Sequence, residues 1–238
     1  MLSSLFTISF LAALGSVVAV GPAAVNLGTT GNYAILAETG ISIVPPSVII
    51  SPAGVSSLTR FSLFLDSTGQ FSTSGCVVGK VFTASDTIPI PAILAAAIGD
   101  MRTAFTDATD RVNPNFSNLA SGAIGGLILG PRLYKWTSGV SIGSDPTGRG
   151  IAWIFQVSRT LTIAAAKKML LIGGALASNI GRVNIVWVVT GAVTAGPGSQ
   201  LEGVILGKTS ITLETGTTAY SRLLSQTFVA LQKATVTP

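Results

Sequence analysis

A short repeat in the second half of the chain restricts its fold more than any other feature. An apolar residue flanked by Thr, Ser, Ala or Gly recurs there, and its successive centres are Val140, Leu161, Val193, Ile211 and Phe228. These centres are 21, 32, 18 and 17 residues apart. A period near 18 residues is short for an array of helix pairs and fits one turn of a β-solenoid with three strands of about six residues. The 32-residue interval predicts a bulge or insertion around Ser178 to Asn184.

One segment, from Pro91 to about Arg111, is predicted to be an amphipathic helix. Its apolar residues follow the i, i+3, i+4, i+7 spacing of a helical stripe, at Ile93, Leu94, Ala97, Ile98, Met101, Ala104, Phe105 and Ala108. Asp86 or Thr87 is expected to cap its start, and Asn113-Pro114 to end it. About 21 residues give a helix roughly 30 Å long, close to the height of six stacked coils at about 4.8 Å each. We therefore expect the helix to lie along the solenoid and to bury its stripe against it.

The absence of histidine excludes several kinds of site. It removes Ser-His-Asp and Cys-His catalysis and histidine metal ligation. Cys76 is the only cysteine, so it forms no intramolecular disulfide and no thiolate cluster, and we expect it to be a buried apolar residue. The net charge of +5 comes from scattered basic residues without interleaved aromatics, which is poor evidence for nucleic-acid binding. No metal, cofactor or nucleic acid is expected.

The acidic residues argue against an enzyme. Some β-solenoids are polysaccharide lyases or hydrolases, and these need paired carboxylates, or a carboxylate and a basic partner, in a groove. No two of the nine acids here fall at matching positions of adjacent repeats; they are Glu38, Asp66, Asp86, Asp100, Asp107, Asp110, Asp145, Glu202 and Glu214. No catalytic residue is predicted.

The N-terminal residues 1–20 are predicted to be a secretory signal peptide. They form an apolar run that ends in small residues, followed by Gly21-Pro22, and no later segment is long and apolar enough to span a bilayer. Residues 21–238 are then one secreted domain, expected to be a monomer with no membrane partner once the signal is removed. Asn115-Phe116-Ser117 is a candidate glycosylation sequence just beyond the helix.

The repeat also predicts two outward columns on one wall, because side chains alternate along a strand. Residues that follow the centres are Ser141, Thr162, Thr194 and Thr212, with Val229 interrupting; those that precede them are Gly139, Thr160, Ala192, Ser210 and Thr227. Thr is common on exposed strands, which explains one such column. Two uncharged columns in register would also form a stiff, flat array spaced by about 4.8 Å, close to an oxygen repeat of ice.

Several segments, in the same order, resemble the ice-binding protein family of cold-adapted fungi, algae and bacteria, and look closest to secreted fungal members. They are Val25–Ala37 (VNLGTTGNYAILA), Phe71–Ser74 (FSTS), Leu133–Ile142 (LYKWTSGVSI), Trp153–Val157 (WIFQV), Leu161–Lys168 (LTIAAAKK) and Glu202–Leu206 (EGVIL). The resemblance runs from about Val25 to Pro238. It implies a mainly β, discontinuous, right-handed solenoid of roughly triangular section, a helix along its side, and adsorption to ice crystals through one flat face. Thermal hysteresis and inhibition of ice recrystallisation would follow.

The chain departs from this family in places that bear on activity. Ile50 leads directly into Ser51-Pro52, so a turn is shortened, and Arg60 and Arg159 stand where small residues are usual. Residues Gly181–Asn184 look inserted. The ice-contacting candidates are Ser141, Thr160, Thr162, Ala192, Thr194, Ser210, Thr212 and Thr227, but the sequence does not decide which wall binds ice. A weakly active or inactive homologue that serves as a cell-surface or matrix-binding module stays an alternative.

Overall fold

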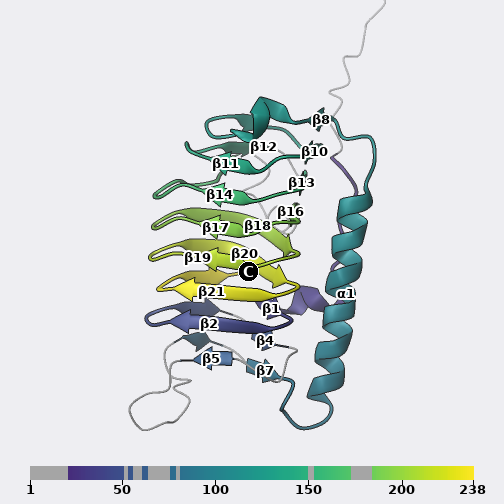
Figure 1. The fold of residues 1–238 in the computed structure, drawn as a ribbon, viewed down its shortest axis with the longest axis vertical. Helices are drawn as coiled ribbons and strands as arrows, with labels where there is room; N and C mark the ends of the chain where they lie inside the picture. Colours follow the sequence, from purple (N-terminus) through teal and green to yellow (C-terminus); the bar gives the residue numbers. More distant parts are fainter. Residues whose placement is uncertain are drawn as a thin grey trace, which may run out of the picture.

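The chain forms a β-solenoid of stacked coils with one long helix upright along its side (Figure 1). The computed structural model describes residues 21–50, 53–55, 61–63, 76–78, 81–149, 153–172 and 184–238. All strand pairs between these residues are parallel, and they form three walls, named a, b and c in the order in which each coil visits them. The predicted mainly β solenoid with one helix is confirmed.

Wall a faces the helix. Its strands, from one end of the stack to the other, are β8 (Phe116–Ser117), β10 (Leu133–Trp136), β13 (Trp153–Val157), β16 (Ile185–Val189), the second halves of β18 (Gln200–Gly207) and β20 (Thr218–Ser225), β1 (Ile35–Ala37), β4 (Ala53–Val55) and β7 (Val81–Thr83). Short 3-10 helices lie at Gly28–Asn32 (η1) and Leu119–Gly122 (η2).

Walls b and c complete each coil. Wall b is a seven-stranded sheet of β11 (Val140–Ile142), β14 (Leu161–Ile163), β17 (Val193–Ala195), β19 (Ile211–Leu213), β21 (Phe228–Gln232), β2 (Gly40–Val44) and β5 (Phe61–Leu63). Wall c contains β9 (Ile128–Leu129), β12 (Thr147–Arg149), β15 (Leu170–Ile172), the first halves of β18 and β20, β22 (Thr235–Thr237), β3 (Val48–Ile50) and β6 (Val77–Val78). Gly203, with φ +98°, lies between the two halves of β18, where the strand passes from wall c to wall a.

The order of coils in space is not the order in the sequence. The coils that hold β1 to β7 lie at one end of the stack, α1 carries the chain to the other end, and the remaining coils return toward the start (Figure 1). The last coil closes this circuit because β21 pairs with β2 and β22 pairs with β3. The N-terminal and C-terminal parts of the chain are thereby joined into one continuous stack.

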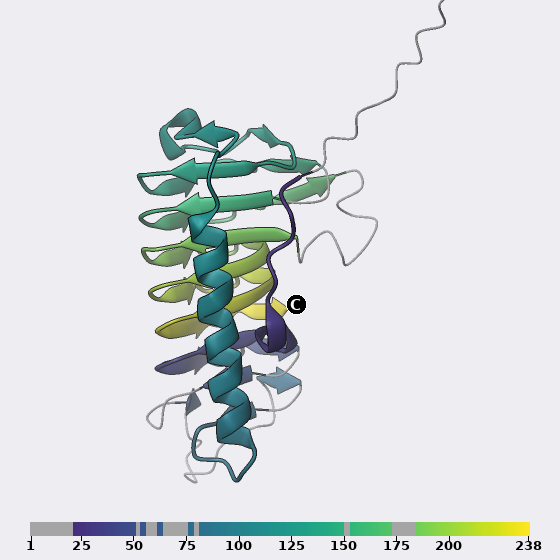
Figure 2. The same ribbon diagram turned by 90° about the vertical axis from the view of Figure 1, so that its right-hand side faces the viewer.

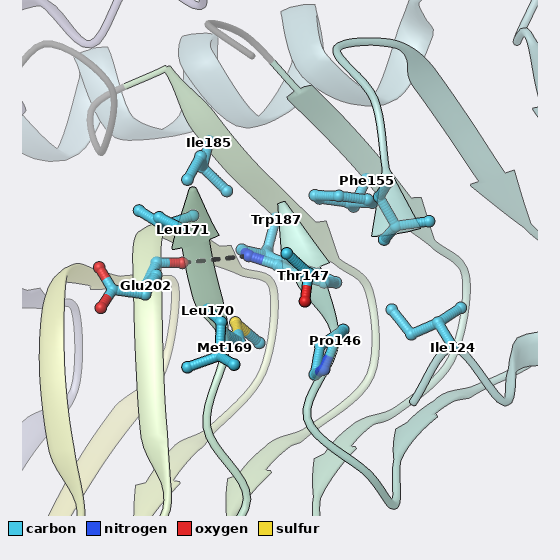
Figure 3. Close-up of a pocket in the computed structure, with 11 residues that line it drawn as sticks. Ile124, Pro146, Thr147, Phe155, Met169, Leu170, Leu171, Ile185, Trp187 and Glu202 are labelled. Atoms are coloured by element: carbon cyan, nitrogen blue, oxygen red, sulfur yellow. Dashed lines mark hydrogen bonds between the residues drawn. The ribbon is translucent and has the colours of Figure 1, made fainter. Parts of the chain in front are cut away.

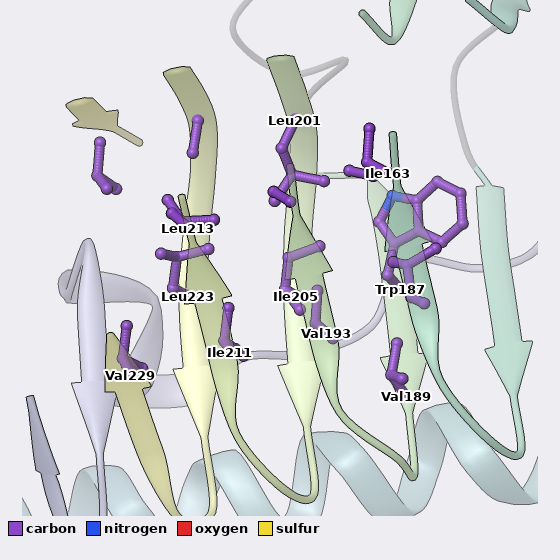
Figure 4. Packing of buried hydrophobic residues seen from close by; sticks show 14 of the residues in the cluster. Ile163, Trp187, Val189, Val193, Leu201, Ile205, Ile211, Leu213, Leu223 and Val229 are labelled. Carbon is purple, nitrogen blue, oxygen red and sulfur yellow. The ribbon is translucent and has the colours of Figure 1, made fainter. Parts of the chain in front are cut away.

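The interior is filled by the inward side chains of the three walls (Figure 4). At the end near β8 the filling is aromatic: Tyr134, Trp136 and Phe155 stack on one another, and Phe155 stacks on Trp187 with ring centroids 4.0 Å apart. The indole N–H of Trp136 donates to the carbonyl of Leu119 at 2.9 Å, so its polar atom is satisfied inside the core. Cys76 is buried, as predicted.

The helix α1 spans Ile90–Asp110, against a prediction of about 91–111. Met101 and Phe105 are 1% and 8% exposed and pack against the outward aliphatic residues of wall a, which confirms the predicted packing. Figure 2 shows the helix lying across the coils of the stack. Ile93 was wrongly placed in the apolar stripe, since it is 47% exposed. At 100° per residue it lies one position off the stripe that Leu94 and Ala97 follow.

The predicted cap of the helix is also wrong. Pro89 is the N-cap residue and makes no side-chain capping bond. Asp86 instead accepts hydrogen bonds from the backbone N–H of Thr83 at 2.8 Å and from its hydroxyl at 3.0 Å. Thr83 and Asp86 are three positions apart in the sequence, which suits a local turn that competes with helix capping for the same carboxylate.

Several predicted features lie outside the described residues. These are the signal peptide at 1–20, the shortened turn at 51–52, Arg60, and all of the predicted insertion at 178–184 except Asn184.

Candidate functional site

The pairing of wall b places one residue from each of its strands in a single line. This central column contains Ser141, Thr162, Thr194, Thr212, Ala230, Ser42 and Ser62. In each of the first six strands, both neighbours of the column residue are buried, as with Leu161 and Ile163 beside Thr162. The alternation fixes the register, because a slip by one residue would turn the apolar side chains to solvent.

A second line, the leading column, stands one position before the buried centres. It contains Gly139, Thr160, Ala192, Ser210, Phe228 and Gly40. The strand centres bond to its carbonyls: Leu161 N–H donates to the oxygen of Ala192, and Val193 N–H to that of Ser210. A Cβ at Gly139 would lie 2.9 Å from the Thr160 hydroxyl oxygen and 3.1 Å from the Thr160 carbonyl oxygen, which is closer than ordinary van der Waals contact. The leading column is therefore closely packed along the stack.

The predicted register of the last repeat is wrong by one residue. Val229, not Phe228, pairs with Ile211 and is buried, while Phe228 is half-buried and pairs with Gly40. Thr227 consequently falls in the turn before β21, where its N–H bonds to the Ser225 hydroxyl oxygen at 3.1 Å. Phe228 was taken as the inward centre, but the four-residue step from Ser225 to Val229 repeats the step from Gly207 to Ile211.

The central column extends further than the repeat predicted. Ala230, Ser42 and Ser62 continue it across the junction between the C-terminal and N-terminal parts of the chain. The triplets Ile41-Ser-Ile43 and Phe61-Ser-Leu63 share the apolar–small–apolar pattern of Val140-Ser-Ile142, and this signal could have revealed them.

The two columns carry no charged residue at any of these positions. Ser141, Thr160 and Thr162 are exposed, and Thr194 and Thr212 are half-buried by their neighbours. Charged groups border the wall: Arg159 and Lys208 are exposed next to the turns, and Glu214 is two residues beyond Thr212. Apart from the ring of Phe228 in the leading column, these positions carry small hydroxyl and methyl groups or no side chain, on a backbone supported by the core.

The other two walls differ from wall b. The helix covers the middle of wall a. On wall c, the outward residues are chemically mixed and include the exposed Ile128 and Leu170, the half-buried Tyr220 and the buried Glu202. Neither wall offers an uncovered and uniform array.

The small recess under wall c is mostly apolar and has one carboxylate (Figure 3). Trp187 donates its indole N–H to the backbone oxygen of Glu202 at 3.2 Å, and the Glu202 carboxylate accepts from the amide of Gln200 at 2.7 Å. No second acid lines the recess, so the paired carboxylates of a glycoside-cleaving site are missing from it.

The acidic groups near the helix have structural partners. Asp100 accepts the backbone N–H and hydroxyl of Thr29 at 2.7 and 2.6 Å, and these hydrogen bonds lower the pKa of its carboxyl. Glu38 pairs with Arg102, with Nε 2.8 Å from the carboxylate. In the part of the chain that the structure describes, no three acidic, cysteine or histidine residues come together as a metal site, and no helix is long and apolar enough to cross a membrane.

Comparisons with known proteins agree with this architecture. The sequence profile of a family described as ice-binding-like matches residues 30–237. Ice-binding protein K1-A of Typhula ishikariensis is 53% identical over 219 residues, which are 88% of each chain. The solved structure of an ice-binding protein from an Arctic yeast superposes with a TM-score of 0.81 at 40% identity and covers 90% of this chain and 94% of that one. A second structure of the yeast protein, in glycosylated form, gives 0.80 at 41% identity, with the same coverage.

Proposed function

The chain belongs to the ice-binding-like family, and from this premise we propose that it adsorbs to ice crystals through wall b. The observation that carries the choice of wall is the central column, in which seven strands present small, uncharged residues in one register. The prediction that the chain is not an enzyme is confirmed by its membership of a non-enzymatic family.

The physical basis is order in the water next to the wall. Parallel strands repeat every 4.7–4.9 Å or so, and this spacing is close to an oxygen repeat of ice. The methyl groups of Thr162, Thr194 and Thr212 hold cages of water, and their hydroxyls anchor these cages to the protein. Charged side chains would bind mobile water more strongly and disturb this order, which is consistent with their position at the border of the wall.

The contact surface is proposed to centre on Thr162, Thr194 and Thr212, with Ser141, Thr160, Ala192 and Ser210 beside them. Ala230 and Ser42 extend it along the stack. Thr227 is left out because its register position belongs to Phe228. We propose that the protein is exported through the signal peptide at 1–20, acts as a monomer, and produces thermal hysteresis and inhibition of recrystallisation.

The decisive experiment enlarges one residue at a time on wall b. In Thr194→Tyr or Thr212→Tyr, a ring would stand above a surface that must be flat, while a half-exposed strand position should change stability by only about 0.5 kcal/mol. Thr235→Tyr is the matched control, because Thr235 is equally half-buried but lies on wall c. Thermal hysteresis and ice shaping are measured in a nanolitre osmometer.

We expect the two wall b variants to lose most of their hysteresis, since adsorption depends on many weak contacts formed together. Thr235→Tyr should keep it. Folded wall b variants with the hysteresis of the parent protein would contradict the proposal for this wall. A parent protein with no effect on ice would instead favour the matrix-binding module.

A further inference from the structure

The sequon Asn115-Phe116-Ser117 has no part in wall b. It is the only Asn-X-Ser/Thr sequence in the chain. It follows the helix and enters β8, the strand at one end of the sheet of wall a, and Asn115 is exposed there. A sequon in a loop between a helix and an edge strand is accessible without disturbing the core.

The hydrogen bonds of Asn115 leave free the atom that would carry a glycan. Its backbone N–H donates to the Leu133 carbonyl at 2.8 Å, and its side-chain Oδ1 accepts the Leu133 N–H at 3.0 Å. Among the described residues Nδ2 has no hydrogen-bond partner. N-glycosylation replaces one hydrogen of Nδ2 and keeps Oδ1 as an acceptor, so both bonds to Leu133 persist in the modified protein.

The strand that follows Asn115, β8, is an edge strand of its sheet. β8 pairs with β10 and is the terminal strand of its sheet within the described structure. Phe116 is 43% exposed and stacks on Tyr134 with ring centroids 5.2 Å apart. β8 is only two residues long and offers little backbone for pairing, but the exposed ring of Phe116 leaves apolar surface at this end of the stack, against which a second molecule can pack.

We propose that Asn115 carries an N-linked glycan that caps this end of the solenoid. Nδ2 attacks the anomeric carbon of a lipid pyrophosphate-linked oligosaccharide; the N–C bond forms, the bond from that carbon to the pyrophosphate oxygen breaks, Nδ2 loses a proton, and the lipid pyrophosphate leaves. The proposal rests on the secretion proposed above, because the oligosaccharide donor is met on the secretory route.

The position is compatible with ice binding. β8 lies at the helix side of the stack, whereas the strands of wall b lie on the opposite side (Figure 1). A glycan on Asn115 therefore extends away from the central column. The related protein from an Arctic yeast has been solved in glycosylated form.

Occupancy is tested by mass spectrometry of protein secreted from a yeast host. The full chain is expressed with its own residues 1–20 and, separately, with these replaced by a leader of the host, so that failure of export and failure of glycosylation are distinguished. The peptide from Val112 to Arg132 is examined after an amidase has removed N-glycans and converted the modified Asn to Asp. Ser117→Ala removes the hydroxyl that the sequon requires but keeps the hydrogen bonds of Asn115 to Leu133. Ser117→Thr preserves the sequon.

We expect most of the secreted parent and Ser117→Thr proteins to be modified at Asn115, and none of the Ser117→Ala protein. Secreted protein with unmodified Asn115, from either leader, would overturn the assignment. If only the host leader gives secretion, a modified Asn115 still supports the glycan, while the export signal at 1–20 is refuted.

The proposal that the glycan caps this end of the solenoid is tested separately, by measuring self-association. In sedimentation velocity, Ser117→Ala should form soluble oligomers several-fold more than the glycosylated parent, with the same hysteresis per mole of monomer. Equal self-association of the two proteins would overturn the cap.

Discussion

Gln156 is a buried polar residue that holds the C-terminal end of the helix against wall a. It lies in β13 and is 4% exposed. Its Nε2 is 2.8, 3.0 and 2.9 Å from the carbonyl oxygens of Ala108, Thr109 and Arg111. The last carbonyls of a helix have no partner within the helix, so this amide satisfies groups that would otherwise be buried without a hydrogen bond. We predict that Gln156→Leu weakens the whole protein.

The loss of stability expected for Gln156→Leu follows from the three carbonyl groups that lose the amide. Ala108 is fully buried, so its oxygen would stay unsatisfied at a cost of about 1–3 kcal/mol, while those of Thr109 and Arg111 are nearer to solvent and lose roughly 1 kcal/mol together. The amide NH2 has only two hydrogens for these three acceptors, and the Gln156 Oε1 that leucine removes is buried without a hydrogen-bond partner among the described residues. Both reduce the cost, so the expected loss is about 1–3 kcal/mol. For a protein of this size, that lowers the melting temperature by roughly 2–12 °C. The exposed Gln232 provides the control, and Gln232→Leu should stay within about 0.5 kcal/mol of the parent.

Gln156→Glu separates this mechanism from a simple loss of packing. A carboxylate there would face carbonyl oxygens, so its folded pKa should rise above the ordinary value of about 4.3. Because the folded state then binds the proton more tightly, stability is greatest below that value and falls as the pH rises through the folded pKa. Thermal unfolding followed by near-UV circular dichroism at about pH 4 and pH 7 should show this variant losing far more stability than the parent on going to pH 7. A Gln156→Leu protein as stable as the parent, or a Gln156→Glu protein without this pH dependence, would refute the role given to the amide.

Three further predictions concern the helix and the absence of cofactors. Phe105→Ala, a large-to-small change in the core, should cost about 3–5 kcal/mol and lower the melting temperature, and ice shaping should fail only as the fold melts; an unchanged melting temperature would contradict the packing of α1. Asp100 has a lowered pKa because Thr29 donates to it, so its contribution to stability is present above the ordinary pKa and is lost as the pH falls through the folded value. Asp100→Asn should therefore reduce the acid sensitivity of unfolding between about pH 5 and pH 2, and equal acid sensitivity in both proteins would disprove the linkage. Exhaustive chelation should leave ice shaping unchanged, whereas a loss that added metal reverses would show a metal requirement.

The sequence predicted those features that depend on local pattern. The stripe of α1 and the inward centres Val140, Leu161, Val193 and Ile211 follow directly from the spacing of apolar residues, and their pairing confirms them. The error at Phe228 arose because the last repeat was aligned one residue out of register. Volume inside a narrow coil is limited, and Val229 fits the inward position while the ring of Phe228 stays half-buried outside.

Features that depend on distant partners were not predicted. Gln156 stands in an otherwise apolar strand, and its acceptors are 45 to 48 residues earlier in the chain. The apolar–small–apolar triplet Ile41-Ser-Ile43 marks Ser42 as a column residue, but the pattern does not give its place in the stack. Its neighbour Ala230 is far away in the sequence, and only the insertion of the last coil beside the first brings them together.

The pairing of β21 with β2 joins the two parts of wall b into one surface. The outward residues of wall a are aliphatic and require the helix as a cover, and those of wall c are mixed, so wall b is the uncovered wall of uniform chemistry. Its array is nevertheless divided between two parts of the chain, because Thr212 meets Ser42 only through Ala230 of β21. Adsorption that needs contacts along the whole stack therefore depends on the docking of the C-terminal coil, which also supplies the pairing between β22 and β3 on wall c. Local opening of that coil would split wall b into two shorter arrays and break the single hydrophobic core that the two parts of the solenoid share.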